Sequence, residues 1–108
     1  MKKILFICSQ NKLRSPTAEQ VFSLDPRLEV SSAGLNNSAN NPLTKELVEW
    51  ADIIFLMEGT HRDKVRKKFK ASLKNQKLVC LNIPDDYDFM DAELIKTLKL
   101  KVTKFLNN

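Results

Sequence analysis

Residues 3–16 read KILFICSQNKLRSP, an apolar run that passes through a polar loop into a helix start. Residues 4–7 are continuously apolar, so residues 3–7 are typical of a short strand covered on both faces. Ser15 and Pro16 favour a helix start, because proline at an early helical position loses no hydrogen bond. The stretch therefore predicts a strand joined to a helix by the loop of residues 8–14.

The same alternation continues through the rest of the chain. Further strands are expected at residues 28–32, 53–57 and 77–81. Helices are expected at residues 15–24, 44–50, 60–73 and 91–106, the last one capped by Asp91. This order predicts an α/β fold, with residues 1–108 as a single domain in three layers: a four-stranded parallel sheet and helices on both faces.

The composition argues against a membrane-spanning or secreted protein. Of the 108 residues, 43% are hydrophobic and 29% are charged, which is an ordinary globular balance. The apolar runs are far shorter than the ~20 residues of a membrane span, so no membrane partner is expected. No small-residue cleavage site follows the first apolar run, and two cysteines allow one bridge at most. We therefore expect a cytoplasmic protein.

The net charge of +5 is unevenly distributed. Residues 61–77 hold eight lysines and arginines against Asp63 alone, whereas residues 85–93 hold five acids. A basic helix beside an acidic loop is usually a solvated face, and attraction of an anionic ligand or partner remains the alternative. Phe69 is the one aromatic residue of the basic stretch, so no nucleic-acid partner is expected.

The loop after the first strand carries the clearest chemistry. A cysteine that ends an apolar strand is more often a core residue, but Cys8 stands at the strand end where α/β proteins bind ligands. The loop can turn successive N–H groups inward around an anion, and the following helix N-terminus adds positive charge. Arg14 supplies a planar fork for two phosphate oxygens. An anion site is predicted from Ser9, Gln10, Asn11, Lys12, Leu13, Arg14 and Ser15.

Such a site also suits nucleophilic chemistry at Cys8. The helix N-terminus and a nearby cation favour the thiolate, and the Ser15 hydroxyl could donate a hydrogen bond to the sulfur. A thiolate held where a phosphate binds can attack phosphorus in line. Cys8 and Arg14 are therefore the first two predicted catalytic residues.

These residues resemble the low-molecular-weight protein tyrosine phosphatase family, whose phosphate loop reads Cys-x5-Arg-Ser-Pro. The likeness continues in Ser32-Ala33-Gly34, in Ala51-Asp52-Ile53-Ile54 before Met57-Glu58, and in Ile83-Pro84-Asp85-Asp86-Tyr87. The chain is similar to a short member of this family. The resemblance implies a protein tyrosine phosphatase that works through a phosphocysteine, without metal or organic cofactor. Its substrates would be phosphotyrosine-containing proteins or small aryl phosphates.

In that family a general acid follows the last strand in an Asp-Pro-Tyr motif. The resemblance assigns the acid to Asp85, two residues before Tyr87, with Asp86 at the proline position and next in order as a candidate. A positioned proton suits this reaction, because the phenolate that leaves has a pKa of ~10. Tyr87 is a further predicted substrate-binding residue, since it could stack on a phosphotyrosyl ring.

The sequence departs from the family pattern at three places. Gln10 stands where a glycine is usual, and Leu13 replaces a second loop cysteine that many relatives carry. Residues 35–42 are a short polar loop in place of a longer segment, which should open one wall of the site or leave it to a partner. Elsewhere we expect His61 on the surface and Cys80 in the core, and we expect Trp50 to be a packing residue rather than a lip for an aromatic substrate.

Two other functions remain alternatives. The chain could be a phosphate-binding or pseudophosphatase module that keeps the loop but turns over poorly. It could also be a thiol-linked arsenate reductase, although such an enzyme needs further cysteines and only Cys80 is available.

Overall fold

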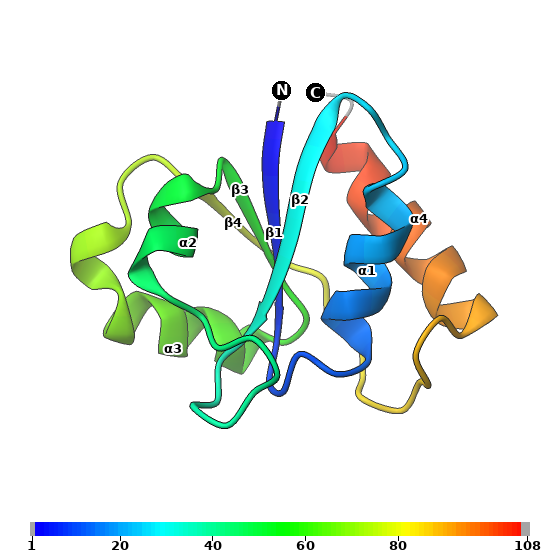
Figure 1. The fold of residues 1–108 in the computed structure, drawn as a ribbon, viewed down its shortest axis with the longest axis horizontal. Coiled ribbons are helices and arrows are strands. Elements are labelled where there is room, and N and C mark those ends of the chain that lie inside the picture. The colour runs from blue at the N-terminus through cyan, green and yellow to red at the C-terminus, as the bar shows by residue number, and fades with distance from the viewer. Residues whose placement is uncertain (1, 107–108) are drawn as a thin grey trace.

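The strand β1 (Lys2–Cys8) lies inside a four-stranded parallel sheet in the computed structural model, which describes residues 2–106 (Figure 1). The sheet order is β2-β1-β3-β4, with β2 at Leu28–Gly34, β3 at Ile53–Leu56 and β4 at Lys77–Cys80. The helices are α1 (Arg14–Phe22), α2 (Lys45–Trp50), α3 (Gly59–Lys68) and α4 (Ala92–Leu106), and the 3₁₀ turn η1 (Lys70–Ser72) follows α3. The predicted α/β fold class is confirmed.

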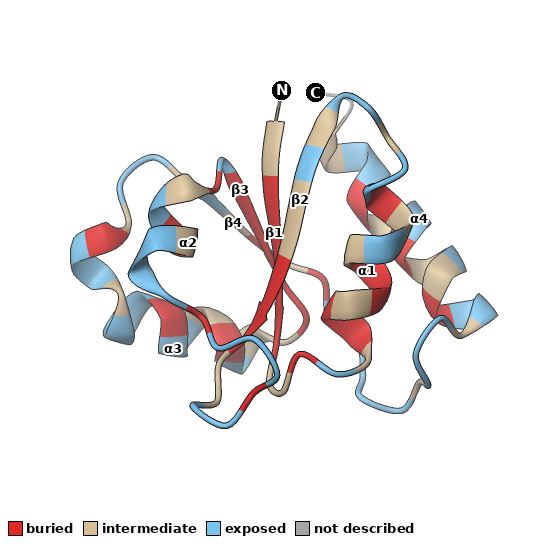
Figure 2. Cartoon of the chain, in the orientation of Figure 1, coloured by how far each residue is buried: buried red, intermediate tan, exposed pale blue. Residues whose placement is uncertain are grey.

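The strand β1 buries side chains on both of its faces, as its apolar run predicts. Ile4 and Phe6 pack in a cluster with residues of α1 and α4, whereas Leu5 and Ile7 pack with residues of α2 and α3. All four side chains are fully buried. In Figure 2 most of the length of β1 has the colour of buried residues. Alternate residues of one strand thus fix two helical layers, one on each side of the sheet (Figure 1).

The helix expected at residues 60–73 is shorter than predicted. It ends at Lys68, because Phe69 leaves helical geometry with φ −119° and ψ 30°, and only η1 follows. The Asp91 cap of α4 is confirmed: its Oδ1 accepts the N–H groups of Glu93 at 2.8 Å and Leu94 at 3.3 Å. None of the helices formed by residues 2–106 is both long and apolar enough to cross a bilayer.

The strand order reverses beside β1. The connection through α1 places β2 on one side of β1, and the chain then crosses to β3 on the other side. Such a reversal leaves a crevice at the carboxyl ends of the strands. Cys8 pairs with Gly34, and Ile7 pairs with both Ala33 and Leu56. The segments that follow the four strands therefore meet at one edge of the sheet.

Candidate active site

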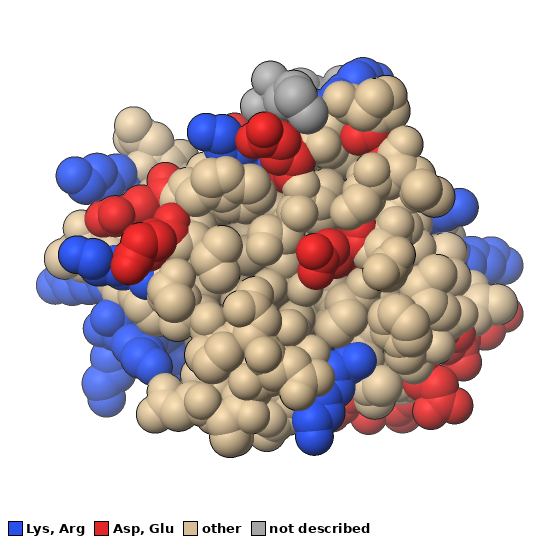
Figure 3. Space-filling model, viewed as in Figure 1, with Lys and Arg blue, Asp and Glu red and all other residues tan. Residues whose placement is uncertain are grey.

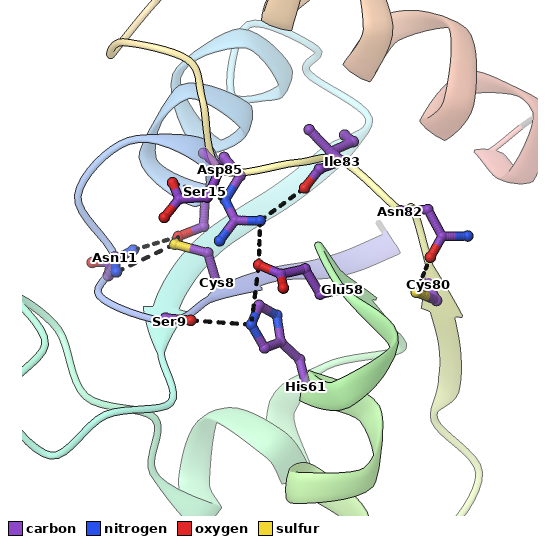
Figure 4. A network of polar contacts seen from close by, with 11 residues as sticks. Cys8, Ser9, Asn11, Ser15, Glu58, His61, Cys80, Asn82, Ile83 and Asp85 are labelled. Carbon is purple, nitrogen blue, oxygen red and sulfur yellow. Dashed lines mark hydrogen bonds and ion pairs between the residues drawn. The ribbon is translucent and has the colours of Figure 1, made fainter.

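The sulfur of Cys8 is buried and receives two polar contacts (Figure 4). Its Sγ lies 2.9 Å from the Ser15 hydroxyl oxygen and accepts the Asn11 backbone N–H at 3.3 Å. The Asn11 side-chain Nδ2 donates to the same Ser15 oxygen at 2.9 Å, which leaves the Ser15 proton free for the sulfur. Two donors therefore converge on Sγ, an arrangement that suits a nucleophilic thiolate.

The loop turns at Asn11 rather than at Gln10, where relatives carry glycine. Asn11 has a φ of 55°, in the left-handed region that asparagine tolerates. Its buried side chain also donates to the Ser32 hydroxyl at 2.9 Å, and Ser32 in turn donates to Glu19 of α1. The loop therefore keeps its closed form without a glycine at residue 10. The left-handed position belongs to Asn11, whose side chain is held by hydrogen bonds to Ser15 and Ser32.

The loop of residues 35–42 braces the Cys8 loop from outside. The backbone N–H groups of Leu35, Asn36 and Asn40 donate to the carbonyl oxygens of residues 8, 9 and 10, each at 3.0 Å. An anion nest needs its carbonyls turned away from the ligand, and these bonds hold three of them there. The segment thus supports the loop directly, whereas the expectation that its shortness opens one wall of the site or leaves it to a partner stays a prediction.

Gly34 permits this close contact between the two loops. A Cβ atom on Gly34 would lie 2.5 Å from the Ala39 Cβ and 2.8 Å from the Ser9 carbonyl oxygen. Both separations are too short for non-bonded carbon and oxygen atoms. A side chain at this position would force the two loops apart.

The Arg14 guanidinium is buried and already held on one side. Its Nη1 donates to Glu58 Oε2 at 2.7 Å and to the Ile83 carbonyl at 2.8 Å, while Nε lies 3.6 Å from Asp85 Oδ1 (Figure 4). The hydrogen bond from Arg14 holds the pKa of Glu58 below its usual value. The two hydrogen bonds of Nη1 fix the plane of the fork, and Nε and Nη2 form the pair of donors that can meet an anion.

His61 is buried, so the prediction that it lies on the surface is wrong. Its Nε2 lies 3.1 Å from the Ser9 hydroxyl oxygen and 3.7 Å from Glu58 Oε2. Burial lowers the pKa of His61, against a smaller raising effect of Glu58. The sequence does hold a signal for this position, because His61 and Val65 are four residues apart and share the buried face of α3.

Asp85 reaches the mouth of the site, which supports the register taken from the family. It lines a cavity of about 120 Å³ together with Cys8, Ser9, Gln10, Lys12, Leu13 and Arg14. Its side chain is 62% exposed. Asp86 is exposed and does not line this cavity, and Tyr87 is half-buried against the core cluster of α1 and α4. The structure thus brings Asp85 to Cys8 and directs Tyr87 toward the core.

Cys80 is only half-buried, and its predicted place in the core is corrected accordingly. It ends β4, an edge strand, where its Sγ donates to Asn82 Oδ1 at 3.1 Å. The strand β3 lies between Cys80 and the strand that carries Cys8. Trp50 is partly buried and packs against the cluster of α2 and α3, which confirms the prediction that it is a packing residue. Within residues 2–106 no three His, Cys, Asp or Glu side chains are grouped to hold a metal ion.

Comparison with known proteins agrees with this geometry. The family model of the low molecular weight phosphotyrosine protein phosphatase matches residues 3–50, which include the Cys8 loop and its brace. No curated protein sequence matches the chain.

Solved structures extend the likeness of fold to nearly the whole chain. The YwlE arginine phosphatase from Geobacillus stearothermophilus has a TM-score of 0.74 and 21% identity, over 99% of this chain and 94% of that one. Wzb from Vibrio vulnificus, in complex with benzylphosphonate, has a TM-score of 0.77 and 22% identity, over 98% and 97%. A low molecular weight protein tyrosine phosphatase from Streptococcus pyogenes has a TM-score of 0.79 and 16% identity, over 99% and 92%. The resemblance to this family is therefore confirmed over residues 3–50, and the likeness of fold extends over nearly the whole chain.

Proposed function

We propose that this chain, which has the fold of the low molecular weight phosphatases and matches their family model over residues 3–50, is a cysteine-dependent phosphomonoester hydrolase. One observation carries the proposal. The buried Cys8 sulfur receives the Ser15 hydroxyl at 2.9 Å and the Asn11 N–H at 3.3 Å. It does so inside a cavity that Arg14 and Asp85 also line. A nucleophile, an anion-binding cation and a proton donor thus face one small space.

The first chemical step transfers the phosphoryl group to sulfur. The Cys8 thiolate attacks phosphorus, the S–P bond forms and the P–O bond to the leaving group breaks. Arg14 Nε and Nη2 and the loop N–H groups bind the non-bridging oxygens. Asp85 gives its proton to the departing oxygen, which then leaves as an alcohol or phenol.

The second step returns the enzyme to its starting state. The Asp85 carboxylate takes a proton from water, the water oxygen attacks phosphorus and the S–P bond breaks. Inorganic phosphate leaves, and the pair of electrons from the S–P bond stays on Cys8. Ser15 and Asn11 then stabilise the regenerated thiolate through the contacts that they make in the resting structure.

Phosphotyrosine in proteins is the substrate that we propose. A phenolate leaving group needs a proton donor, and the position of Asp85 at the cavity mouth supports that role. The two free thiols of the described residues, on Cys8 and Cys80, support a reducing, cytoplasmic location. Structural relatives include both tyrosine and arginine phosphatases, so the direct test compares two peptides of one sequence that carry phosphotyrosine or phosphoarginine. A higher kcat/KM for the phosphotyrosyl peptide is expected.

A phosphate-binding module of the same fold is the second candidate. It is favoured by one observation: the Asp85 side chain is 62% exposed and pairs with Arg14 only at 3.6 Å. An arsenate reductase has less support, because β3 separates Cys80 from the strand of Cys8.

Steady-state hydrolysis of phenyl phosphate, measured beside phosphate binding, separates these functions. The proposal expects turnover by the wild type and binding of inorganic phosphate at the Cys8 loop. Phosphate binding without turnover would favour the binding module. Arsenate reduction that depends on an added thiol would favour the reductase.

A further inference from the structure

A lysine-lined groove lies beside the Cys8 loop. It has a volume of about 460 Å³, and its lining residues are Leu35, Asn36, Lys64, Lys67 and Lys68. In Figure 3 the basic side chains gather on the side of the molecule where Figure 1 shows α3, and acidic side chains gather toward the opposite lower corner. We call this feature the lysine groove.

Two contacts connect the lysine groove to the catalytic cavity. Asn36, which lines the groove, donates its N–H to the Ser9 carbonyl at 3.0 Å, and Ser9 also lines the cavity. His61 at the start of α3 contacts the Ser9 hydroxyl at 3.1 Å. With a rise of about 1.5 Å per residue, Lys64 and Lys68 follow His61 by about 4.5 and 10.5 Å along the helix. The lysines are therefore arranged along α3 at increasing distance from the cavity that contains Cys8.

Every charged residue that lines the groove is positively charged. Its lining contains three lysines and no acid, and Asp63 of α3 does not take part in it. Lys68 Nζ contacts Asn37 Oδ1 at 3.3 Å, a neutral partner that leaves its charge uncompensated. Leu35 adds an apolar wall against which aliphatic stems can pack. Such a surface is complementary to an acidic segment.

We propose that the lysine groove binds acidic residues that flank the phosphorylated residue of a protein substrate. This inference rests on the proposed function and names the substrate class for the same site. An extended peptide advances about 3.3 Å per residue, so three residues span the ~10 Å between His61 and Lys68. Acidic residues within about four positions of the phosphorylated residue are therefore the ones that the groove selects.

Matched phosphotyrosyl peptides test the groove directly. In each pair, Asp and Glu on one flank of the phosphotyrosine are replaced by Asn and Gln, and separate pairs test the two flanks. We expect kcat/KM to be roughly tenfold higher for the acidic peptide of one pair, and this preference to shrink as salt rises. The double variant Lys67→Glu and Lys68→Glu should abolish the preference.

A second double variant controls for net charge. Lys96 and Lys99 are exposed on α4 outside the groove, so Lys96→Glu with Lys99→Glu makes the same change of charge elsewhere. This control should keep most of the preference. Each kcat/KM is divided by the same enzyme's value for para-nitrophenyl phosphate, which removes differences in folded fraction. Should the groove variant fail to fold, the double variant Lys67→Gln and Lys68→Gln takes its place. The comparison of each peptide pair with the wild-type enzyme tests the proposal in either case.

The outcomes of these experiments distinguish a failure of the groove proposal from a failure of the proposed function. Equal kcat/KM for acidic and neutral peptides, with an active wild type, would overturn the groove alone. No hydrolysis of any substrate would instead overturn the proposed function. Equal loss of preference in both double variants would show a long-range effect of net charge and also overturn the groove. Single-stranded RNA that binds the wild type but not the groove variant, without peptide discrimination, would identify a different partner.

Discussion

The two walls of the catalytic cavity are built in different ways. On the Cys8 side, Arg14 and Ser15 are at most 2% exposed. Hydrogen bonds donated by Asn11 and by residues 35–40 hold the loop, and Glu58 accepts one from Arg14. On the other side, Asp85 is 62% exposed and meets Arg14 at 3.6 Å. The wall that we propose to bind the anion is thus preorganised, whereas the proposed proton donor stands at the solvent edge, where a leaving group can reach it.

Of the replacements in the two walls, that of Cys8 should lower turnover the most. Cys8→Ser is nearly isosteric, and a serine oxygen stays protonated where the thiolate acts. We expect turnover of para-nitrophenyl phosphate to fall roughly 10,000-fold or more, with the folded structure retained. Inorganic phosphate should still bind, because the loop and Arg14 are unchanged. Retained turnover would remove Cys8 from the mechanism.

Replacement of Asp85 tests the exposed wall. For Asp85→Asn we expect kcat/KM for phenyl phosphate to fall about 100-fold to 10,000-fold, the usual range for one general acid. The loss should be much smaller for para-nitrophenyl phosphate, whose leaving group needs less protonation. Asp86→Asn is the matched control, because Asp86 is exposed and outside the cavity lining. A larger leaving-group-dependent loss in Asp86→Asn would shift the assignment by one residue, and Asp88 follows if neither variant shows it.

Replacement of Glu58 tests how the arginine is held. Glu58→Gln keeps the shape but removes the charge that pairs with Arg14 Nη1 at 2.7 Å. A displaced guanidinium should lower kcat/KM for aryl phosphates about tenfold to 100-fold. Glu46→Gln, exposed on α2, is the control and should change kcat/KM little. Equal kcat/KM in the two variants would show that the negative charge of Glu58 is not needed to position Arg14.

The pH dependence of stability is the smallest predicted effect. Burial lowers the pKa of His61 from 6.5, so the unfolded chain binds a proton that the folded chain resists. The free energy of unfolding should therefore be constant above about pH 6.5 and fall as the pH drops below it. Urea unfolding at pH 7.5 and pH 5.5 measures this change. In His61→Gln the difference between the two pH values should be smaller, and an unchanged difference would assign it to other groups.

Local patterns in the sequence were enough to predict much of the fold. The apolar run of residues 4–7 determines a strand buried on both faces, and Asp91 determines the start of α4 through its own side chain. The Cys8 loop is also local, since its residues stand between one strand and one helix. Patterns of this kind are visible because the interacting residues are near neighbours in the chain.

The parts that the sequence analysis missed depend on distant contacts. His61 contacts a residue 52 positions away, and Glu58 holds one 44 positions away. Both follow β3, and only the pairing of β3 with β1 brings them to the Cys8 loop. The brace formed by residues 35–42 likewise depends on the pairing of Cys8 with Gly34. The spacing of His61 and Val65 is a weak local signal for the buried face of α3, and the surrounding charges masked it.

Detection of a phosphoryl group on Cys8 tests the phosphocysteine mechanism most directly. In Asp85→Asn with para-nitrophenyl phosphate, the first step needs little acid, whereas the second step lacks its base, so the intermediate should accumulate. We expect a burst of para-nitrophenolate equal to the enzyme concentration. Rapid quenching and mass spectrometry should then find one phosphoryl group on the peptide that contains Cys8. Steady turnover with no burst, and with that peptide unmodified at every time point, would contradict the mechanism.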